Sequence, residues 1–404
     1  MVDTSSLDKS GFDRAGFDAI SPIRSGIVYP AQTTINQYPI KIADDSCNYK
    51  GIIFTYSYFG WTRRLYEPDG FTLELNTNST YSDHLSLGNY ILFSDFEDYI
   101  GYIEDVNYVQ DERTQTLTIN GRDPSGLLQN RIALYGTNSG TGYDDQSGNA
   151  ETVILHYINE NAIDATDASR NINGLGINTD EGRGEFVSYS ARFQTLDEIV
   201  NTLSVSGELG YKTVFDKTEC KGILTFIEGT DHSYTSENPV IFKNDFHNII
   251  SLNINKSIVN NVNLAYVGDN QEDASRVLTE VYINTEPSGN DRIELFVDGS
   301  DTTTEAERTT LGQSEIIQNQ TEISIAAEIN PGPDSGFTYG VDYDLGDIVS
   351  LEFEDTIYDL RIVQVLLEFD RENRKKVTLT LGKPLRSFVK DITNKTGPTA
   401  QERI

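Results

Sequence analysis

The sequence predicts a mainly β protein with an α+β middle region, in which two related β-barrel or β-sandwich domains accompany a smaller helix-containing domain. The first observation is compositional, because the 404 residues include 22 Tyr and 18 Phe, and aromatic and β-branched side chains favour half-buried pleated surfaces. The second is the alternation of apolar and polar residues between turn signals along most of the chain. The third is a phrase that occurs twice, as LGNYILFSDFEDYIGYIEDV from Leu87 and as LGDIVSLEFEDTIYDLRIVQV from Leu345.

Residues 1–40 are predicted to form an extended N-terminal arm. The segment GFDRAGFDA repeats Gly-Phe-Asp at a spacing of five residues, which fits neither a helix nor a strand. Phe12 and Phe17 are the expected anchors of this arm on a neighbouring molecule. The alternative is a disordered polar tail.

Residues 41–132 are predicted to form the first β domain, because segments such as FTLELN alternate apolar and polar side chains. Trp61 is expected to be a core or interface anchor, with a sugar-stacking platform as the alternative. Arg63 and Arg64 stand out on an acidic chain, and we expect them to pair with acids of a neighbouring subunit.

Residues 133–245 are predicted to form a middle α+β domain with two helices. The helix at 151–163 is indicated by apolar residues that recur on one helical face. The helix at 195–207 begins with a capping box made by Thr195 and Glu198.

The rest of the chain is divided into three segments. Residues 246–322 are expected to hold a β segment and a helix that link to the last domain. Residues 323–388 form the predicted second β domain, and residues 389–404 form a polar tail.

The doubled phrase is interpreted as an internal duplication, with convergence of two similar antiparallel hairpins as the alternative. Each copy opens a strand with a structural repeat motif in which Gly allows a positive φ at a corner; the motif residues are Leu87, Gly88, Asn89, Leu345, Gly346 and Asp347. Further landmarks follow in the same order at offsets of 257–262 residues, namely FED in both copies, Ile103 and Val106 with Ile362 and Val365, and TLTINGR with TLTLGKP. Three chains that each hold two equivalent domains would present six equivalent places on a ring.

The charge of the chain excludes several classes of partner. Asp and Glu number 63 against 31 Lys and Arg, which gives a formal net charge of −32, so there is no basic stripe for nucleic acid or anionic lipid. Three interpretations stay open: a protein adapted to high salt in a halophilic host, a channel wall to which DNA does not adhere, and an acidic protein with neither role. The sequence has no apolar run long enough to span a bilayer and no signal-peptide pattern at its N-terminus.

No catalytic, cofactor-binding or metal site is predicted. Cys47 and Cys220 are far apart in sequence and suggest neither a disulfide framework nor a zinc site. His156 is assigned a surface or partner-contact role, because no His lies at metal-ligand spacing. Two acidic loops have oxygen ligands suited to Ca²⁺, with plain solvated loops as the alternative; their acids are Asp144, Asp145, Asp298, Asp301 and Glu305. A glycosidase-type carboxylate pair is a further alternative.

About residues 45–385 resemble the baseplate hub, or tail-associated, proteins of siphovirus-type tailed phages and archaeal tailed viruses. No single segment is diagnostic, and the resemblance is carried by the order and spacing of GYIEDV, TLTINGRDPSGLLQNRI, AETVILHYINENAI, TLDEIVNTLSVSGELGYKTVFD, NNVNLAYVG, RIELFVDGSD and VDYDLGDIVSLEF.

This resemblance implies a structural virion protein without enzymatic activity or cofactor. It would be a homotrimeric hub at the tail tip, assembled in the host cytoplasm, with two tube-like β domains per chain in a pseudo-six-fold ring. Such a hub adapts a six-fold tail tube to a three-fold tip and lines the channel that genome DNA passes through without specific binding. The implied partners are the tail tube or distal tail protein, the tape measure protein and a tip fibre or receptor-binding protein, with no membrane insertion. The alternative is a carbohydrate-binding adhesin or receptor-binding β protein.

Overall fold

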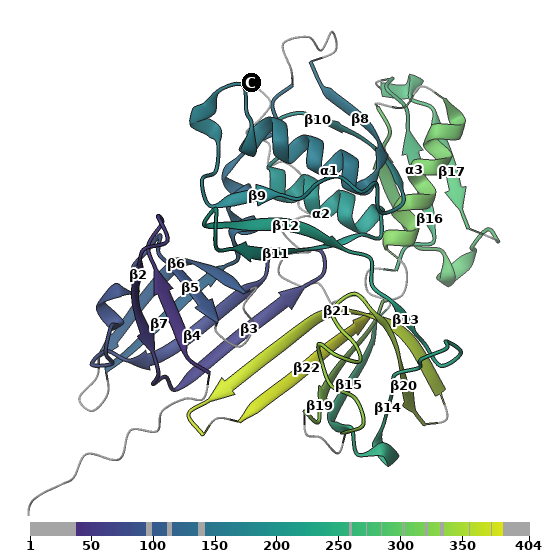
Figure 1. The fold of residues 1–404 in the computed structure, drawn as a ribbon. Coiled ribbons are helices and arrows are strands. Elements are labelled where there is room, and N and C mark those ends of the chain that lie inside the picture. Colours follow the sequence, from purple (N-terminus) through teal and green to yellow (C-terminus); the bar gives the residue numbers. More distant parts are fainter. Residues whose placement is uncertain are drawn as a thin grey trace, which may run out of the picture.

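The computed structural model describes residues 38–93, 99–110, 115–135, 142–257, 261–271, 273–283, 285–300, 302, 304–319, 322–331, 335–354, 356–372 and 374–382. Strands predominate over helices (Figure 1), so the prediction of a mainly β protein is confirmed. The predicted arm anchors Phe12 and Phe17 and the predicted tail at 389–404 lie outside the described residues.

Seven strands near the N-terminus form half of a large sheet, in the spatial order β3-β4-β7-β6-β5-β1-β2. Alternation of apolar and polar residues places every second side chain of β4 and most of β7 in the core, as their burial patterns show. The strands are β1 (Ile40–Ala43), β2 (Tyr49–Ile53), β3 (Tyr58–Arg64), β4 (Gly70–Asn76), β5 (Tyr90–Phe93), β6 (Ile100–Gln110) and β7 (Gln115–Arg122).

Seven further strands form the other half. The order β15-β19-β22-β21 continues directly onto β3, and β20 pairs with β21 and with the short parallel strands β13 and β14, which gives 14 strands in one sheet. The strands are β13 (Asp231–His232), β14 (Ile241–Lys243), β15 (Ile249–Ser257), β19 (Glu322–Ile329), β20 (Ile348–Phe353), β21 (Thr356–Asp370) and β22 (Lys375–Gly382). Strands β14 and β15 thus pair with strands of the predicted 323–388 segment, although both precede it in sequence by many residues.

The middle region packs two helices against small sheets and has its own apolar core (Figure 1). Both predicted helices are present: α1 (Ala150–Ile158) continues into a π-helical turn at Asn159–Ile163, and α2 (Leu196–Ser206) starts at the predicted capping box. The strands are β8 (Asp144–Asn149), β9 (Leu175–Ile177), β10 (Phe186–Ala191), β11 (Gly210–Asp216) and β12 (Lys221–Ile227).

A third small unit lies between β15 and β19 in sequence. Its sheet has the order β17-β16-β18, and helix α3 packs on it through a core that includes Val267, Val281 and Ile316. The elements are β16 (Leu264–Gly268), β17 (Leu278–Tyr282), β18 (Glu294–Asp298) and α3 (Glu305–Gln318). Within the described residues, every helix is too short or too polar to cross a membrane.

A disulfide joins Cys47 and Cys220, whose Cα atoms lie 5.7 Å apart, although the sequence suggests no disulfide framework for these cysteines. Each cysteine has a positive φ in the turn of a hairpin, one between β1 and β2 and the other between β11 and β12. The 173 residues between them conceal the proximity of the two turn tips.

Candidate functional site: the seam between two β units

Two groups of five strands share one connectivity. We define the first β unit as β3 to β7 and the second β unit as β15 together with β19 to β22. Their spatial orders are β3-β4-β7-β6-β5 and β15-β19-β22-β21-β20, and every neighbouring pair is antiparallel. Taken in chain order, each strand of one unit therefore has a counterpart at the same place in the other.

The corners at the repeat motif have the same backbone geometry. The two Gly residues have positive φ, +85° at Gly88 and +94° at Gly346, a region that Gly enters at little cost. In each unit the Gly N–H donates to the long strand, and the long strand donates back to the residue after the Gly. These bonds join Gly88 to Ile103 (3.0 Å) and Ile103 to Asn89 (2.9 Å), and Gly346 to Ile362 (2.9 Å) and Ile362 to Asp347 (2.8 Å).

The side chains of the motif have different surroundings in the two units. Leu87 is 65% exposed, whereas Leu345 is buried. The Asn89 amide donates to the backbone oxygen of His84, whereas the Asp347 carboxylate accepts from the backbone N–H groups of Thr230 and Asp344. The shared feature is therefore the backbone turn.

A β-bulge interrupts the long hairpin at the same place in each unit. The register shifts between Ile103 and Asp105 in β6 and between Ile362 and Gln364 in β21, which are equivalent positions in the sequence match. Bulges fix register and increase the local twist of a hairpin.

Strand pairing beyond the bulge changes the alignment of the last matched segments, TLTINGR and TLTLGKP. Val106 pairs with Ile119, and Val365 pairs with Leu379, whereas the match of TLTINGR to TLTLGKP aligns Leu117 with Leu379. The structural equivalence differs from that match by two residues, which is one strand period, so the same face still points to the core.

The two units meet along what we call the seam, formed by β3 and residues 364–370 of β21. Seven antiparallel pairs connect them, from Tyr58 with Asp370 to Arg64 with Gln364. Phe59 and Phe369 stack across the seam with ring centroids 6.2 Å apart. Both are fully buried in a single core that contains residues of both units.

Trp61 is a core residue at the seam. It is 1% exposed and stacks between Phe71 at 5.7 Å and Tyr99 at 5.2 Å. Its Nε1–H donates to Asp69 Oδ2 at 3.1 Å. The expectation of a core anchor is confirmed, and burial leaves no face for sugar stacking.

Arg63 crosses the seam through its side chain. It is 3% exposed and donates to the Tyr339 hydroxyl and to Asp344 Oδ1, each at 2.6 Å. Its guanidinium lies over the ring of Tyr99, and its Nε is 3.9 Å from Asp69 Oδ2. These acceptors come from the same chain, so the expected pairing of Arg63 with a neighbouring subunit is wrong.

Arg64 also has partners within its own chain. Its guanidinium donates to the backbone oxygen of Pro68 at 2.9 Å and lies 3.9 Å from Glu67. Both partners are in the short turn between β3 and β4, and Arg64 keeps 32% of its side chain exposed, so its pairing with a neighbouring subunit stays a prediction.

Two buried carboxylates, Asp69 and Asp123, lie next to the seam residue Arg64 and the turn that follows it. Asp69 accepts from the backbone N–H of Arg64, and Asp123 accepts from the backbone N–H of Asp69 and from Thr213 on β11 of the middle region. Burial and the nearby Asp123 raise the pKa of Asp69 to about 6, and burial also raises the pKa of Asp123. The charged forms are disfavoured because little water reaches either group.

The other predicted acids do not converge. Asp144 Oδ2 lies 2.9 Å from His156 Nε2, and Asp145 accepts from Ser190. Asp298 pairs with Arg276, Glu305 begins α3, and Asp301 lies outside the described residues. Throughout the described ranges, no three His, Cys, Asp or Glu side chains are grouped to hold a metal ion.

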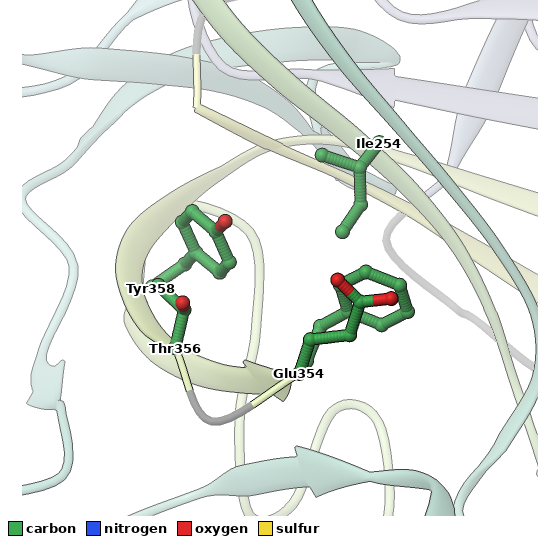
Figure 2. A pocket seen from close by; sticks show the side chains of 5 residues that line it. Ile254, Glu354, Thr356 and Tyr358 are labelled. Atoms are coloured by element: carbon green, nitrogen blue, oxygen red, sulfur yellow. The ribbon is translucent and has the colours of Figure 1, made fainter.

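A pocket of about 430 Å³ lies at the β20–β21 hairpin. Figure 2 shows Ile254 of β15 facing the hairpin residues Glu354, Thr356 and Tyr358. Register makes Ile254 the counterpart of Trp61, because the ladders Trp61–Phe71–Gly121–Ile103 and Ile254–Ile325–Leu381–Ile362 cross equivalent strands.

Sequence reasoning missed most residues that hold the seam. Asp69 and Asp123 lie in the turn sequences PDG and DPSG, and Asp123 caps a 3₁₀ helix that begins with Pro124. The sequence alone could therefore have predicted a turn at Asp69 and a helix cap at Asp123. The sequence could not have predicted the pairing of Arg63 with Asp344, because 281 residues separate them.

Comparisons with known proteins agree with this fold. Residues 39–383 match the family described as Siphovirus ReqiPepy6 Gp37-like protein. The 43 kDa tail protein of prophage MuSo2 from Shewanella oneidensis superposes with a TM-score of 0.55 at 14% identity, over 85% of this chain and 97% of that one. The prophage tail protein gp18 from Listeria monocytogenes EGD-e gives 0.52 at 13% identity, over 88% and 97%. At these identities the likeness shows a shared fold.

No curated protein matches the chain. The family match covers most of the sequence and includes both β units and the regions between them. The chain belongs to the Siphovirus ReqiPepy6 Gp37-like protein family.

Proposed function

We propose that the chain is a structural protein of a virion tail tip, a homotrimeric hub that adapts a six-fold tail tube to a three-fold tip. The observation that carries this proposal is the pair of five-strand units of one connectivity, joined side by side in a continuous sheet. Membership of a siphovirus family and a fold shared with two prophage tail proteins support it.

The geometric argument starts from the seam. Two equivalent units that meet edge to edge in one chain occupy two adjacent places on a curved sheet. Repetition of the same joint between chains closes a ring when the rotation per joint divides a full turn. With two units per chain, three chains supply six places, and each place offers similar strands to a six-fold tube.

The net charge of −32 supports a channel through which genome DNA passes without specific binding. The proposed partners are the tail tube or distal tail protein, the tape measure protein and a tip fibre or receptor-binding protein. We propose no enzymatic activity for the chain. A halophilic host, the link to archaeal tailed viruses and assembly in the host cytoplasm stay predictions.

Mass photometry of the purified chain, alone and with the tail-tube protein of the same virus, tests the proposal. We expect particles with the mass of three chains when the chain is alone, or particles that contain three copies of the chain once the tube protein is added. A chain that remains monomeric under both conditions, or forms only dimers, would overturn the hub and favour a monomeric adhesin.

A further inference from the structure

Half of one edge of β6 has no partner strand in the described part of the chain. Strand β6 pairs with β7 along its length, but it pairs with β5 only through residues 100–102. Among the described residues, no strand pairs with the other edge of residues 105–110. In β21, the counterpart of β6, residues 356–361 pair with β20 and residues 364–370 pair with β3.

The outer edge of β15 is open in the same way. Strand β15 pairs with β19, and within the described part of the chain no strand pairs with its other edge. Its counterpart β3 uses the corresponding edge to pair with β21. The described part of each chain therefore contains one complete seam, β3 with β21. It also contains β6 and β15, the counterparts of β21 and β3, whose corresponding edges are unpaired.

These two edges carry few of the charges that usually protect an open strand. Residues 105–110 read DVNYVQ and residues 251–257 read SLNINKS, with one charge each and of opposite sign. Soluble proteins usually protect open edges with several charges, Pro or bulges, because an unprotected edge recruits another strand. Tyr108 and Val109 on β6 are each 52% exposed.

We infer that residues 105–110 of β6 in one copy pair antiparallel with residues 252–257 of β15 in a second copy. This inference rests on the proposed trimer and names its contact surface. The register follows from the seam: Val365 with Arg63, Leu367 with Trp61 and Phe369 with Phe59 become Val106 with Lys256, Tyr108 with Ile254 and Gln110 with Leu252. The partner is a second copy of this chain, because only the second β unit carries the counterpart of β3.

The pocket beside Ile254 fits this register. In the first unit Trp61 fills the equivalent space and stacks on Tyr99, whereas the second unit has the smaller Ile254 with Tyr358, the counterpart of Tyr99, across the pocket (Figure 2). Tyr108 of the next copy faces Ile254 in the inferred pairing, and its ring occupies that pocket. Burial of such a ring is a common source of interface affinity.

Cysteine cross-linking tests the register. In a background with Cys47→Ser and Cys220→Ser, the pair Asn107→Cys and Asn255→Cys places two exposed positions directly opposite each other. The matched control combines Asn107→Cys with Ser251→Cys, which is four residues out of register. We expect mild oxidation to give covalent dimers and trimers of the first pair and little product from the control.

The same samples, weighed by mass photometry with and without the tube protein, separate the two proposals. Trimers that cross-link equally in both variants, or in neither, would overturn the register while the hub stands. Monomers throughout would overturn both. As a second variant, Tyr108→Lys should weaken trimer formation about tenfold while the unfolding midpoint of the chain stays unchanged; a trimer of unaltered affinity would contradict the inference.

Discussion

The two β units share one order of strand pairing, but they differ in their connecting segments and in the side chains that fill their cores. The first unit connects β3 to β4 by a turn of five residues and fills its core with its own Trp61. The second unit connects β15 to β19 through the whole unit of β16 to β18 and α3, and it leaves a pocket beside Ile254. A corner with positive φ and a bulge are common to both units, so these backbone features define the repeat, while loops and edges are free to differ.

The two units also contribute differently to the seam, because the Arg63 side chain of the first unit donates to acceptors that belong to the second unit. Trp61 is the single Trp of the chain and lies in this seam. Its fluorescence therefore reports on the unfolding of the joint between the two units, and the stability predictions below use it.

Loss of the Arg63 charge is expected to have the largest effect. Arg63→Met leaves Asp69 without its nearest cation and Asp344 without its partner, and we expect a loss of about 3–5 kcal/mol in the free energy of unfolding. The control Arg64→Met removes a more exposed guanidinium and should cost less than about 1 kcal/mol. Urea unfolding followed by Trp61 fluorescence measures both, and equal losses would mean that Arg63 does not hold the seam.

The two motif glycines should respond unequally. A Cβ at Gly346 would lie 2.7 Å from Ile227 Cγ2, whereas a Cβ at Gly88 would meet only the Tyr102 hydroxyl at 3.7 Å. Gly88→Ala should cost about 1–2 kcal/mol from backbone strain. Gly346→Ala should cost about 2–4 kcal/mol because overpacking adds to that strain. The same urea unfolding measures both, and the reverse order would contradict the description of the two corners.

The disulfide ties the β1–β2 hairpin, whose strand β1 pairs with β5 of the first unit, to the middle region. The chain has two cysteines and both are used, so the second unit has no such bond. Replacing Cys47 and Cys220 by Ser is expected to lower the free energy of unfolding by about 2–3 kcal/mol. A reducing agent should produce the same loss in the native chain and none in the double variant. If the reducing agent shifts both proteins alike, the effect does not come from this bond.

The smallest expected effect is a dependence on pH. The pKa of Asp69 is raised to about 6 in the folded chain, so the folded state favours the protonated form. This contribution to stability is fully present below about pH 4, the usual Asp range, and is lost as the pH rises through about 6.

Asp69→Asn should remove a change on the order of 1–2 kcal/mol between pH 5 and 7, in addition to a fixed loss of one acceptor. Glu67→Gln, in the same turn but 60% exposed, is the control and should leave the pH profile unchanged. An Asp69→Asn profile identical in slope to that of the native chain would contradict the burial argument.

The sequence reveals most of the local structure. Alternation identifies β4 and β7, the Thr195 capping box starts α2, and the doubled motif marks the two corners. These signals act over a few residues, and local geometry decides them. The sequence match also aligns Ile103 with Ile362, which is where the structure places the two bulges.

What the sequence does not reveal depends on distant partners. The disulfide of Cys47 and Cys220, the hydrogen bond from Arg63 to Asp344, and the pairing of β14 and β15 with the last strands all join residues at least 65 positions apart. Pairing at such distances follows from how the units pack, and no spacing within a single segment encodes it.

The copy number in a complex with the tail-tube protein tests the central claim most directly, and native mass spectrometry measures it. Two interchangeable β units per chain predict three copies of this protein for each ring of six tube subunits. Six copies per ring, one for each tube subunit, would contradict the account, because each chain would then fill a single place.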